Sequence, residues 1–312
     1  MKKRLIIGSR GSKLALWQSQ WVQQALSDHH AHLQIDIHTI KTRGDKILDV
    51  PLAKVGGKGL FVKEIEQALL DGHIDLAVHS MKDMPGDIPA GLCIGAVPLR
   101  ESPEDVLISR TGTRLADLAG GAKIGTSSLR RAAQLRIARP DLDIQPIRGN
   151  LDTRLKKLDD GEFDAIVLAA AGVKRLELTH RITDYLDMTT MLPAVGQGAL
   201  CIEIREGDTA VEKALAALND PDTHTAVKAE RAFLHRLEGG CQTPIAAHAQ
   251  LKNNQIHLVG MVADLDGRQS FRGSISGTPD TAEQIGVQLA NQLLDQGARE
   301  TLDNLKELAN DC

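Results

Sequence analysis

Short apolar runs alternate with longer amphipathic segments along residues 4–204. The apolar run at 4–8 precedes a segment, 14–25, whose apolar positions recur at helical spacing, and a second short run follows at 35–40. This pattern predicts strands that alternate with helices, an order that forms right-handed βαβ units and a mostly parallel sheet.

The same order of elements begins again at residue 122. In both stretches the first strand ends at glycine and small hydroxyl residues follow, in IIGSRGS and in KIGTSS. The third strands also share their start, in DGHIDLAV and DGEFDAIV. We therefore predict two similar α/β lobes with a cleft between them, because ligands gather at the carboxyl ends of such strands.

Two segments rich in proline or glycine, 98–103 and 192–198, are predicted to be hinges. The apolar run at 199–204 follows the second hinge and is expected to return the chain to the first lobe. The predicted domains are a first lobe (1–98 plus 199–217), a second lobe (99–198) and a small C-terminal domain (218–312).

The C-terminal domain is predicted to combine helices with a short antiparallel sheet. Helical patterns span 225–237 and 281–308. Alternating apolar positions predict strands at 245–251, 255–263 and 268–276, with a hairpin turn at Asn253-Asn254.

The composition is typical of a soluble globular protein, with 42% hydrophobic and 25% charged residues in 312. The formal charge of -4 gives no field that would favour a polyanion, so no nucleic acid partner is expected. No apolar run approaches the roughly 18 residues of a membrane span, and the N-terminus lacks an apolar signal region. We expect a cytoplasmic protein without membrane association.

The four cysteines lie far apart without a CxxC pair, so no metal site is predicted. Cys93 and Cys201 stand in apolar strand-like runs and are interpreted as small buried hydrophobic residues. Cys312 is terminal and uninformative. Cys241 lies in EGGCQTP, a loop that would present its thiol outside regular structure, and here a functional and a structural role are equally open.

Cations and hydroxyl groups follow almost every predicted strand of the two lobes. Together with the free N–H groups of helix starts, they are suited to bind carboxylates or phosphates. Any one of these arginines could instead be paired at the surface, but their number at the expected ligand edge favours an anion site. They are Arg10, Ser12, Thr126, Ser127, Ser128, Arg130, Arg131, Arg148 and Arg154.

The third strand of the first lobe ends in HSMKDMP, which places Ser80, Lys82 and Asp83 at the cleft edge. Among so many cations, Asp83 is suited to accept a hydrogen bond from an N–H group and to stabilise a developing positive charge. The alternative is that it caps the turn or pairs with Lys82. His79 is interpreted as a packed strand histidine.

The segment KVGGKGLFVK contains Lys54 and Lys58 but is not a Walker motif, because Lys58 is followed by Gly59. No GxGxxG motif occurs either. The functional interpretation is a flexible basic loop that closes over an anionic ligand, and the alternative is a plain surface turn.

The chain closely resembles the porphobilinogen deaminase family of tetrapyrrole biosynthesis. The resemblance runs over essentially the whole chain and rests on the blocks LALWQSQ, TRGDKILDVPLAKVGGKGLFVKE, DLAVHSMKDMP, GTSSLRRAAQL, IRGNLDTRLKKL, LPAVGQGA and ERAFLHRLEGGCQTPI. It implies an α/β fold with two periplasmic-binding-protein-like (type II) lobes around a cleft, plus a small α+β C-terminal domain with a three-stranded antiparallel sheet. It also implies a monomer.

The resemblance further implies a transferase whose dipyrromethane cofactor is attached to Cys241 through a thioether, since a thiolate is the nucleophile such an attachment needs. The cofactor would prime the addition of four porphobilinogen molecules, each losing ammonia. Water would then release the linear tetrapyrrole hydroxymethylbilane. Each pyrrole carries an acetate and a propionate, which would account for the many cations.

Matching positions imply that Asp83 is catalytic, binding pyrrole N–H groups and stabilising the cationic species. The implied cofactor-binding residues are Cys241, Ser80, Lys82, Thr126, Ser128, Arg130, Arg131, Gly149 and Arg154. The implied substrate-binding residues are Arg10, Ser12, Gln18, Arg148, Arg154 and Arg175, with Lys54, Lys58 and Phe61 in a lid.

Two other functional classes stay open on the residues alone. A non-catalytic anion-binding module would share the two lobes and the cationic cleft, but it would need neither Cys241 nor Asp83. A nucleotide-dependent enzyme would need a phosphate loop or a dinucleotide motif, and this sequence has neither.

Overall fold

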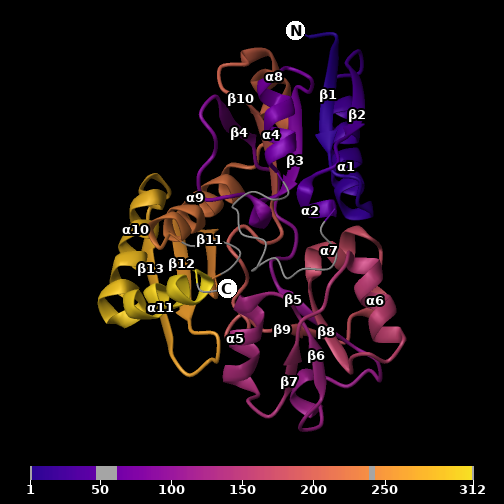
Figure 1. Cartoon of the computed structure of the whole chain (residues 1–312). Coiled ribbons are helices and arrows are strands. Elements are labelled where there is room, and N and C mark those ends of the chain that lie inside the picture. The colour runs from indigo at the N-terminus through magenta and orange to yellow at the C-terminus, as the bar shows by residue number, and fades with distance from the viewer. Residues whose placement is uncertain (1, 47–61, 239–242, 311–312) are drawn as a thin grey trace.

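The computed structural model of the chain describes residues 2–46, 62–238 and 243–310 (Figure 1). Within these ranges the strands form two five-stranded sheets and one three-stranded sheet. The two larger sheets lie one above the other in Figure 1, and the three-stranded sheet lies to one side of them. The prediction of two α/β lobes and a smaller region with an antiparallel sheet is confirmed.

The first lobe is built on a sheet with the order β2-β1-β3-β10-β4. The first three of these strands are parallel, and β10 runs antiparallel to both of its neighbours. The strands are β1 (Arg4–Ser9), β2 (Gln34–Thr39), β3 (Leu76–Ser80), β4 (Leu92–Ala96) and β10 (Leu200–Arg205). The helices are α1 (Lys13–His29), α2 (Arg43–Lys46), α4 (Lys63–Leu70) and α8 (Thr209–Leu215).

The second lobe has a sheet with the order β7-β6-β8-β5-β9, in which β5 is the antiparallel strand. The strands are β5 (Asp105–Ser109), β6 (Lys123–Gly125), β7 (Asp143–Gln145), β8 (Ala165–Ala169) and β9 (Asp184–Leu186). The helices are α5 (Leu129–Ala138), α6 (Leu151–Asp159) and α7 (Ala170–Arg175).

Each large sheet therefore has four strands in one direction and one against them. The reversed strand is the first that the chain forms after crossing from the other lobe, namely β5 after residues 97–104 and β10 after residues 187–199. The expected return of 199–204 to the first lobe is confirmed. The expectation of mostly parallel sheets holds for four strands of each sheet, and the crossings explain the fifth.

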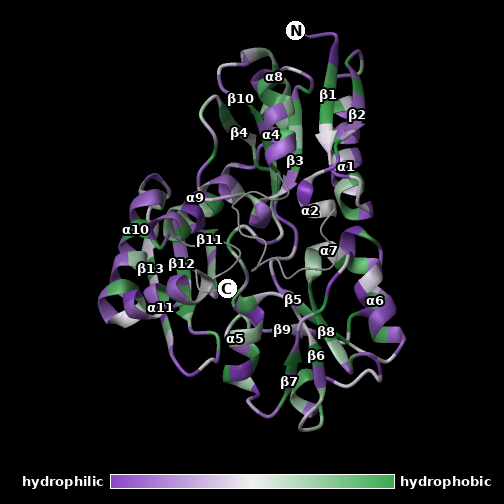
Figure 2. Cartoon of the chain, viewed as in Figure 1, coloured by the Kyte–Doolittle hydropathy of each residue, from purple (hydrophilic) through white to green (hydrophobic). Residues whose placement is uncertain are grey.

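Local sequence explains where the helices of the lobes begin. The Ser12 hydroxyl accepts a hydrogen bond from the Ala15 N–H (3.3 Å), and the Ser128 hydroxyl accepts one from the Arg131 N–H (3.5 Å). The repeated pattern of strand, glycine and serine is thus a repeated helix cap. The strands β5, β8 and β10 are buried along nearly their whole length and are largely apolar (Figure 2).

The third region packs helices against the three-stranded sheet β11-β12-β13. Its elements are α9 (Pro221–Arg236), β11 (Ile245–Lys252), β12 (Gln255–Ala263), β13 (Ser270–Gly277), α10 (Ala282–Leu293) and α11 (Arg299–Asn310). Helix α9 begins earlier than predicted, because Asp220 accepts a hydrogen bond from the Thr223 N–H (2.7 Å) and Pro221 fits the first helical turn.

In the third region the structure confirms the predicted hairpin turn and shows a helix break that was not predicted. Asn253 and Asn254 adopt φ angles of 52° and 57°, as a two-residue type I′ hairpin requires. The single closing helix predicted over 281–308 is wrong, because Gly297 at φ 117° divides it into α10 and α11. A Cβ atom at Gly297 would lie 3.1 Å from the Phe271 ring, so packing against β13 accompanies this break.

Candidate active site

The carboxyl end of β3 carries the polar residues predicted for the first lobe. Its last residue, Ser80, accepts a hydrogen bond from the Gln18 side-chain amide of α1 (2.9 Å). A short 3-10 turn, Met81–Asp83, follows and is fixed by a bond from the Met81 N–H to the Ala199 carbonyl oxygen (3.0 Å). Asp83 is exposed, so its carboxylate is accessible to a ligand.

Lys82 is half-buried next to Asp83. Burial and the positive charge of Arg131 lower the pKa of Lys82 to about 8, against the opposing charges of Asp83 and Asp105. The lysine of the first lobe therefore lies within electrostatic range of an arginine of the second lobe. Near neutral pH it is still mostly protonated.

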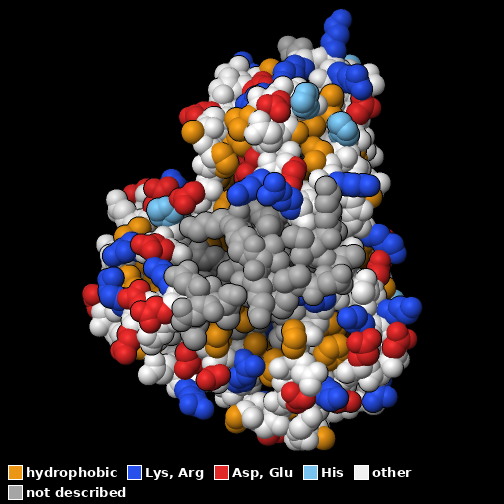
Figure 3. All heavy atoms as spheres, viewed as in Figure 1, with side chains coloured by type: hydrophobic (Ala, Val, Ile, Leu, Met, Phe, Trp, Pro, Cys, Tyr) orange, Lys and Arg blue, Asp and Glu red, His pale blue; other side chains and the backbone are white. Residues whose placement is uncertain are grey.

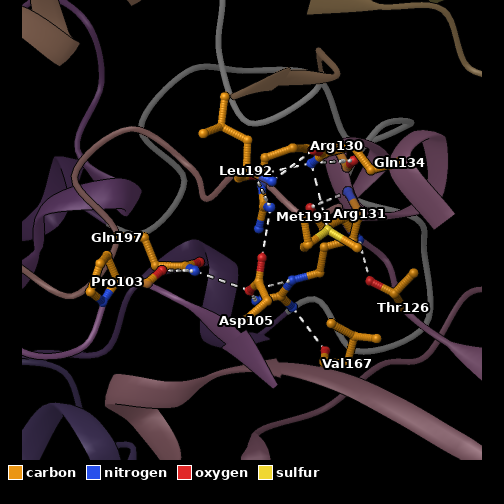
Figure 4. A network of polar contacts seen from close by, with 11 residues as sticks. Pro103, Asp105, Thr126, Arg130, Arg131, Gln134, Val167, Met191, Leu192 and Gln197 are labelled. Atoms are coloured by element: carbon orange, nitrogen blue, oxygen red, sulfur yellow. Dashed lines mark hydrogen bonds and ion pairs between the residues drawn. The ribbon is translucent and has the colours of Figure 1, made fainter. Parts of the chain in front are cut away.

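Arg130 and Arg131, in the first turn of α5, are buried in an ion-pair network around Asp105 (Figure 4). Arg131 donates to Asp105 Oδ1 from Nε (3.0 Å) and Nη2 (2.7 Å), and Arg130 donates to Oδ2 from Nη1 (2.7 Å). Burial alone would raise the pKa of Asp105, but the two guanidinium groups outweigh it and lower this pKa to about 2. One carboxylate thus orders two cations and leaves a net positive charge.

One donor of this network, Arg130 Nε, could still bind a ligand. Arg130 Nε is buried and has no hydrogen-bond partner among the described residues. Buried donors are almost always paired in folded proteins, so a carboxylate that reached Arg130 would complete the network. The loop before α5 is ordered by a bond from the Ser128 N–H to Thr126 Oγ1 (3.2 Å), which holds both hydroxyl residues beside the arginines.

Helix α6 and the segment before it add a second pair of cations, Arg154 and Arg148. Arg154 is half-buried and donates from Nε to the Gly149 carbonyl oxygen (2.8 Å). Burial and the charges of Arg131 and Arg148 lower the pKa of Arg154 to about 10, and Asp83 opposes this shift. The structure therefore brings together, across the two lobes, Lys82, Asp83, Arg131, Arg148 and Arg154.

Three other predicted site residues lie where the fold is held together, and contacts of Ser12 and Arg175 stabilise it. Ser12 caps α1, and Arg10 is half-buried between β1 and that helix. Arg175 donates from Nη2 to the Gly198 carbonyl oxygen (2.7 Å), and its guanidinium lies 5.9 Å from the centre of the Trp17 ring. These contacts of Arg175 tie α7 to the second crossing and to α1.

Four predicted site residues lie outside the described residues: Lys54, Lys58, Phe61 and Cys241. The cysteines predicted to be structural are described, and Cys201 is fully buried in β10 while Cys93 is half-buried in β4. His79 is buried in β3, as predicted, and its Nε2 lies 3.1 Å from Glu203 Oε2.

Sequence analysis missed the acidic partners that order the cations. Asp105 was visible as an acid at the start of the apolar strand DVLIS, which would be costly to bury without a cation. Glu230 of α9 was missed too, although it accepts hydrogen bonds from Arg100 Nη1 (2.6 Å) and from the Gly196 N–H (2.6 Å). Glu230 therefore joins the third region to both crossings.

On the face seen in Figure 3, acidic and basic side chains are interspersed over all three regions. Along 2–46, 62–238 and 243–310, no helix is long and apolar enough to cross a membrane, and no group of three or more His, Cys, Asp or Glu side chains is placed to hold a metal ion. The described residues place several cations beside one exposed acid, Asp83.

Comparison with protein families decides the class of the chain. Residues 5–213 match the family described as "Porphobilinogen deaminase, dipyromethane cofactor binding domain", and residues 224–295 match "Porphobilinogen deaminase, C-terminal domain". The chain belongs to the porphobilinogen deaminase family. The predicted membership, transferase class and dipyrromethane cofactor are thereby confirmed.

Relatives of this family match along nearly their whole length. Porphobilinogen deaminase of Syntrophobacter fumaroxidans is 55% identical over 98% of this chain and 99% of its own. The enzyme of Syntrophotalea carbinolica is 56% identical over 94% and 93%, and that of Carboxydothermus hydrogenoformans is 51% identical over 100% of both chains.

More distant solved structures also align with this chain. The periplasmic aliphatic sulphonate binding protein SsuA from Escherichia coli is 16% identical over 76% of this chain and 71% of its own, with a TM-score of 0.41. The periplasmic VFT2 domain of Bordetella pertussis BvgS is 16% identical over 72% and 91%, with a TM-score of 0.42.

Proposed function

We propose that this porphobilinogen deaminase family member condenses four porphobilinogen molecules, with loss of ammonia, onto a dipyrromethane primer attached to Cys241, and then releases hydroxymethylbilane. The observation that carries this proposal is the exposed carboxylate of Asp83 within electrostatic range of Arg154 of the facing lobe, next to Lys82, which lies within range of Arg131. Such a site suits a substrate that has several carboxylates and becomes cationic as it reacts.

Asp83 is the proposed catalytic residue. When ammonia leaves the aminomethyl group, the substrate pyrrole becomes positively charged and its N–H becomes a stronger donor. A fixed carboxylate that accepts this N–H hydrogen bond stabilises the cation more than it stabilises the neutral substrate. A primer held at Cys241 would supply the free pyrrole α-carbon for the first addition, and the terminal ring of the growing chain would supply it for each later one, each α-carbon losing a proton as its new bond forms.

The proposed cofactor residues fit a group that carries several carboxylates. The unpaired buried Nε of Arg130 is the structural support for this fit, because it offers a strong donor to a carboxylate. We assign the cofactor carboxylates to Ser80, Lys82, Thr126, Ser128, Arg130, Arg131, Gly149 and Arg154. We assign the incoming substrate to Arg10, Ser12, Gln18, Arg148, Arg154 and Arg175, with Lys54, Lys58 and Phe61 closing over it.

The domain limits proposed for this activity are 1–98 plus 199–217, 99–198 and 218–312. Their support is that each segment supplies the strands of one sheet. We propose a cytoplasmic monomer that takes porphobilinogen as its small-molecule partner and binds neither nucleic acid nor membranes. The net charge of -4 supports the absence of a nucleic acid partner.

Intact-mass measurement of the purified protein tests the proposal most directly. We expect the wild type to carry an excess equal to two linked pyrroles, and the Cys241→Ser variant, prepared in the same way, to lack it. A wild type without this excess should gain mass in steps of one pyrrole when porphobilinogen is added. A mass that never rises would contradict the proposed function and would favour a binding protein.

A further inference from the structure

Several bonds join the two crossings between the lobes, and one of the side chains that make them is Gln197, which is fully buried. Its Nε2 donates to the Pro103 carbonyl oxygen on the first crossing (2.7 Å) and to Asp105 Oδ1 (3.0 Å). Gln197 itself belongs to the second crossing. One amide group therefore joins both hinge segments to the carboxylate that orders the arginine pair (Figure 4).

Gln197 and Arg131 share the same oxygen atom. Asp105 Oδ1 accepts from Gln197 Nε2 at 3.0 Å, from Arg131 Nη2 at 2.7 Å and from Arg131 Nε at 3.0 Å. An oxygen with three donors holds each of them less firmly than it would hold one. A change in the position or charge pairing of Arg131 must therefore change the bond to Gln197.

The network also contains two polar atoms that could accept or donate one more hydrogen bond. Among the described residues, Gln197 Oε1 and Arg130 Nε are both buried without a hydrogen-bond partner. A carboxylate ligand on the arginine pair would compete with Asp105 for their positive charge and free Oδ1 to bind Gln197 more strongly. The hinge around Gln197 is tightly packed, because a Cβ atom on the neighbouring Gly198 would lie 2.2 Å from the Glu101 carbonyl oxygen.

We propose that Gln197 is a positioning residue that couples the inter-lobe hinge to the Arg130–Arg131 pair through Asp105. Loading carboxylates on the pair then stabilises the hinge, and by linkage a stabilised hinge holds those carboxylates more tightly. The inference rests on the proposed function only for the identity of the ligand, the carboxylates of the growing pyrrole chain. The coupling itself is a property of the protein without ligand.

The test uses hydrogen exchange of the full-length protein, read on peptides that cover 97–104 and 191–198. Gln197→Met keeps the side-chain length and removes the amide. Gln134→Met is the matched control, because Gln134 is also a buried amide that anchors the second crossing, through Leu192 (3.0 and 2.8 Å), and it donates to the Arg130 backbone carbonyl oxygen (3.3 Å) rather than to Asp105. Arg131→Lys is the perturbation, since lysine cannot chelate Oδ1 from two nitrogens.

Without pyrroles, Arg131→Lys relieves Asp105 Oδ1 of guanidinium donors and strengthens its bond to Gln197, so we expect it to slow hinge exchange by about tenfold in the wild-type and Gln134→Met backgrounds. We expect almost no further effect of Arg131→Lys in the Gln197→Met background. A merely structural glutamine would give additive effects, so an undiminished tenfold change in Gln197→Met would overturn the proposal. If Gln197→Met does not fold, Gln197→Asn replaces it as the background, because it withdraws the amide by one methylene. The effect of Arg131→Lys on hinge exchange is then compared in the same way.

The second arm adds porphobilinogen and counts bound pyrroles by intact mass. We expect hinge exchange to slow with loading in the wild type and in Gln134→Met, and not in Gln197→Met. Equal slowing in Gln197→Met, with normal loading, would refute the coupling and leave the proposed function intact. If the mass never rises, the proposed function fails, and the ligand-free arm alone decides the coupling.

Discussion

The two lobes have the same strand order but place different charged groups at their facing edges. In the first lobe, β3 ends at Ser80, and the turn after it carries Lys82 and the exposed acid Asp83. In the second lobe, the equivalent strand β8 ends in Ala169 and continues into the apolar start of α7. Its cations come instead from the first turns of α5 and α6.

This difference shows how two lobes with the same backbone pattern can contribute different side chains to one shared region between them. The shared feature is the capped helix after the first strand of each lobe, at Ser12 and Ser128. The side chains at the facing edges are different, because the first lobe presents an exposed carboxylate beside one lysine and the second presents arginines ordered by Asp105. A substrate with several carboxylates that becomes cationic as it reacts needs both.

The buried acids of the lobes differ in the same way. Asp105 in the second lobe is paired with two arginines. In the first lobe, Glu66 and Glu203 are buried near each other, with His79 bonded to Glu203 and a carboxylate oxygen of each acid unpaired among the described residues. The stability contributed by the buried acids of the two lobes should therefore change in opposite directions as the pH rises.

The largest expected effect is that of Asp83→Asn on turnover. The amide has nearly the same shape but cannot stabilise a cation, so we expect turnover to fall by about 10²–10³-fold. Because Asp83 is exposed, the melting temperature should stay close to that of the wild type. Steady-state product release and thermal unfolding measure the two effects.

Asp87→Asn is the control for that experiment. Asp87 is exposed on the same segment and contacts His235 (2.9 Å) rather than the cations of the second lobe. We expect it to retain near-normal turnover. If Asp83→Asn also turned over normally, Asp83 would not be the catalytic residue.

The next effect is on stability, through Asp105→Asn. Removing one partner of a buried ion pair leaves uncompensated charge, so we expect unfolding to become easier by about 3 kcal/mol at pH 7. The pKa of Asp105 is lowered from 3.8 to about 2, so the stabilisation is full above pH 4 and is lost as the pH falls toward 2. Urea unfolding between pH 7 and pH 2 measures both.

Asp141→Asn provides the matched control, since Asp141 also receives two hydrogen bonds from one arginine, Arg139, but lies at the surface. We expect a much smaller change for this exposed pair. Equal effects of the two substitutions would show that burial of Asp105 does not matter.

Asp105 also marks the limit of what the sequence could predict. The strand ends, the helix caps and Asp83 follow from local patterns, so they could be found without a structure. The pairing of Asp105 with Arg130 depends on which two strands become neighbours, and Gln197 depends on where the crossings meet. The break at Gly297 likewise accompanies contact with Phe271 on another strand.

Glu66→Gln should have the opposite pH dependence to Asp105→Asn. Burial and the charge of Glu203 raise the pKa of Glu66 from 4.5 to about 7, with His79 and Lys63 opposing. The folded protein therefore loses stability as the pH rises from about 4.5 to 7. We expect Glu66→Gln to be about 1–3 kcal/mol more stable than the wild type at pH 8, and nearly equal at pH 4.5.

Urea unfolding at these two pH values checks the prediction. Glu64→Gln, on the same helix, is the control because Glu64 accepts the Arg43 N–H (3.1 Å) and is not among the groups that act on Glu66. A variant of Glu66 that gained nothing at pH 8 would show that the acid pair is not strained.

A smaller effect is expected from Lys82. Its pKa of about 8 means that a cation of the site is lost as the pH rises through this value. We expect kcat/KM to fall by about three- to tenfold between pH 7 and pH 9 in the wild type. Lys82→Arg keeps its charge over this range, so the same fall in that variant would assign the pH dependence to another group.

The smallest effect should come from the exposed ion pair that connects the lobes at α1 and α6. Lys13 Nζ lies 2.8 Å from Asp152 Oδ2, and the two side chains are 78% and 44% exposed. Water and salt screen such a pair, so we expect Lys13→Ala to change the free energy of unfolding by at most about 0.5 kcal/mol, and less at high salt. Urea unfolding at low and high ionic strength measures this. A change well above 1 kcal/mol would mean that the lobes are held together at this outer contact, whereas a negligible change leaves the buried crossings around Gln197 as the connection that matters.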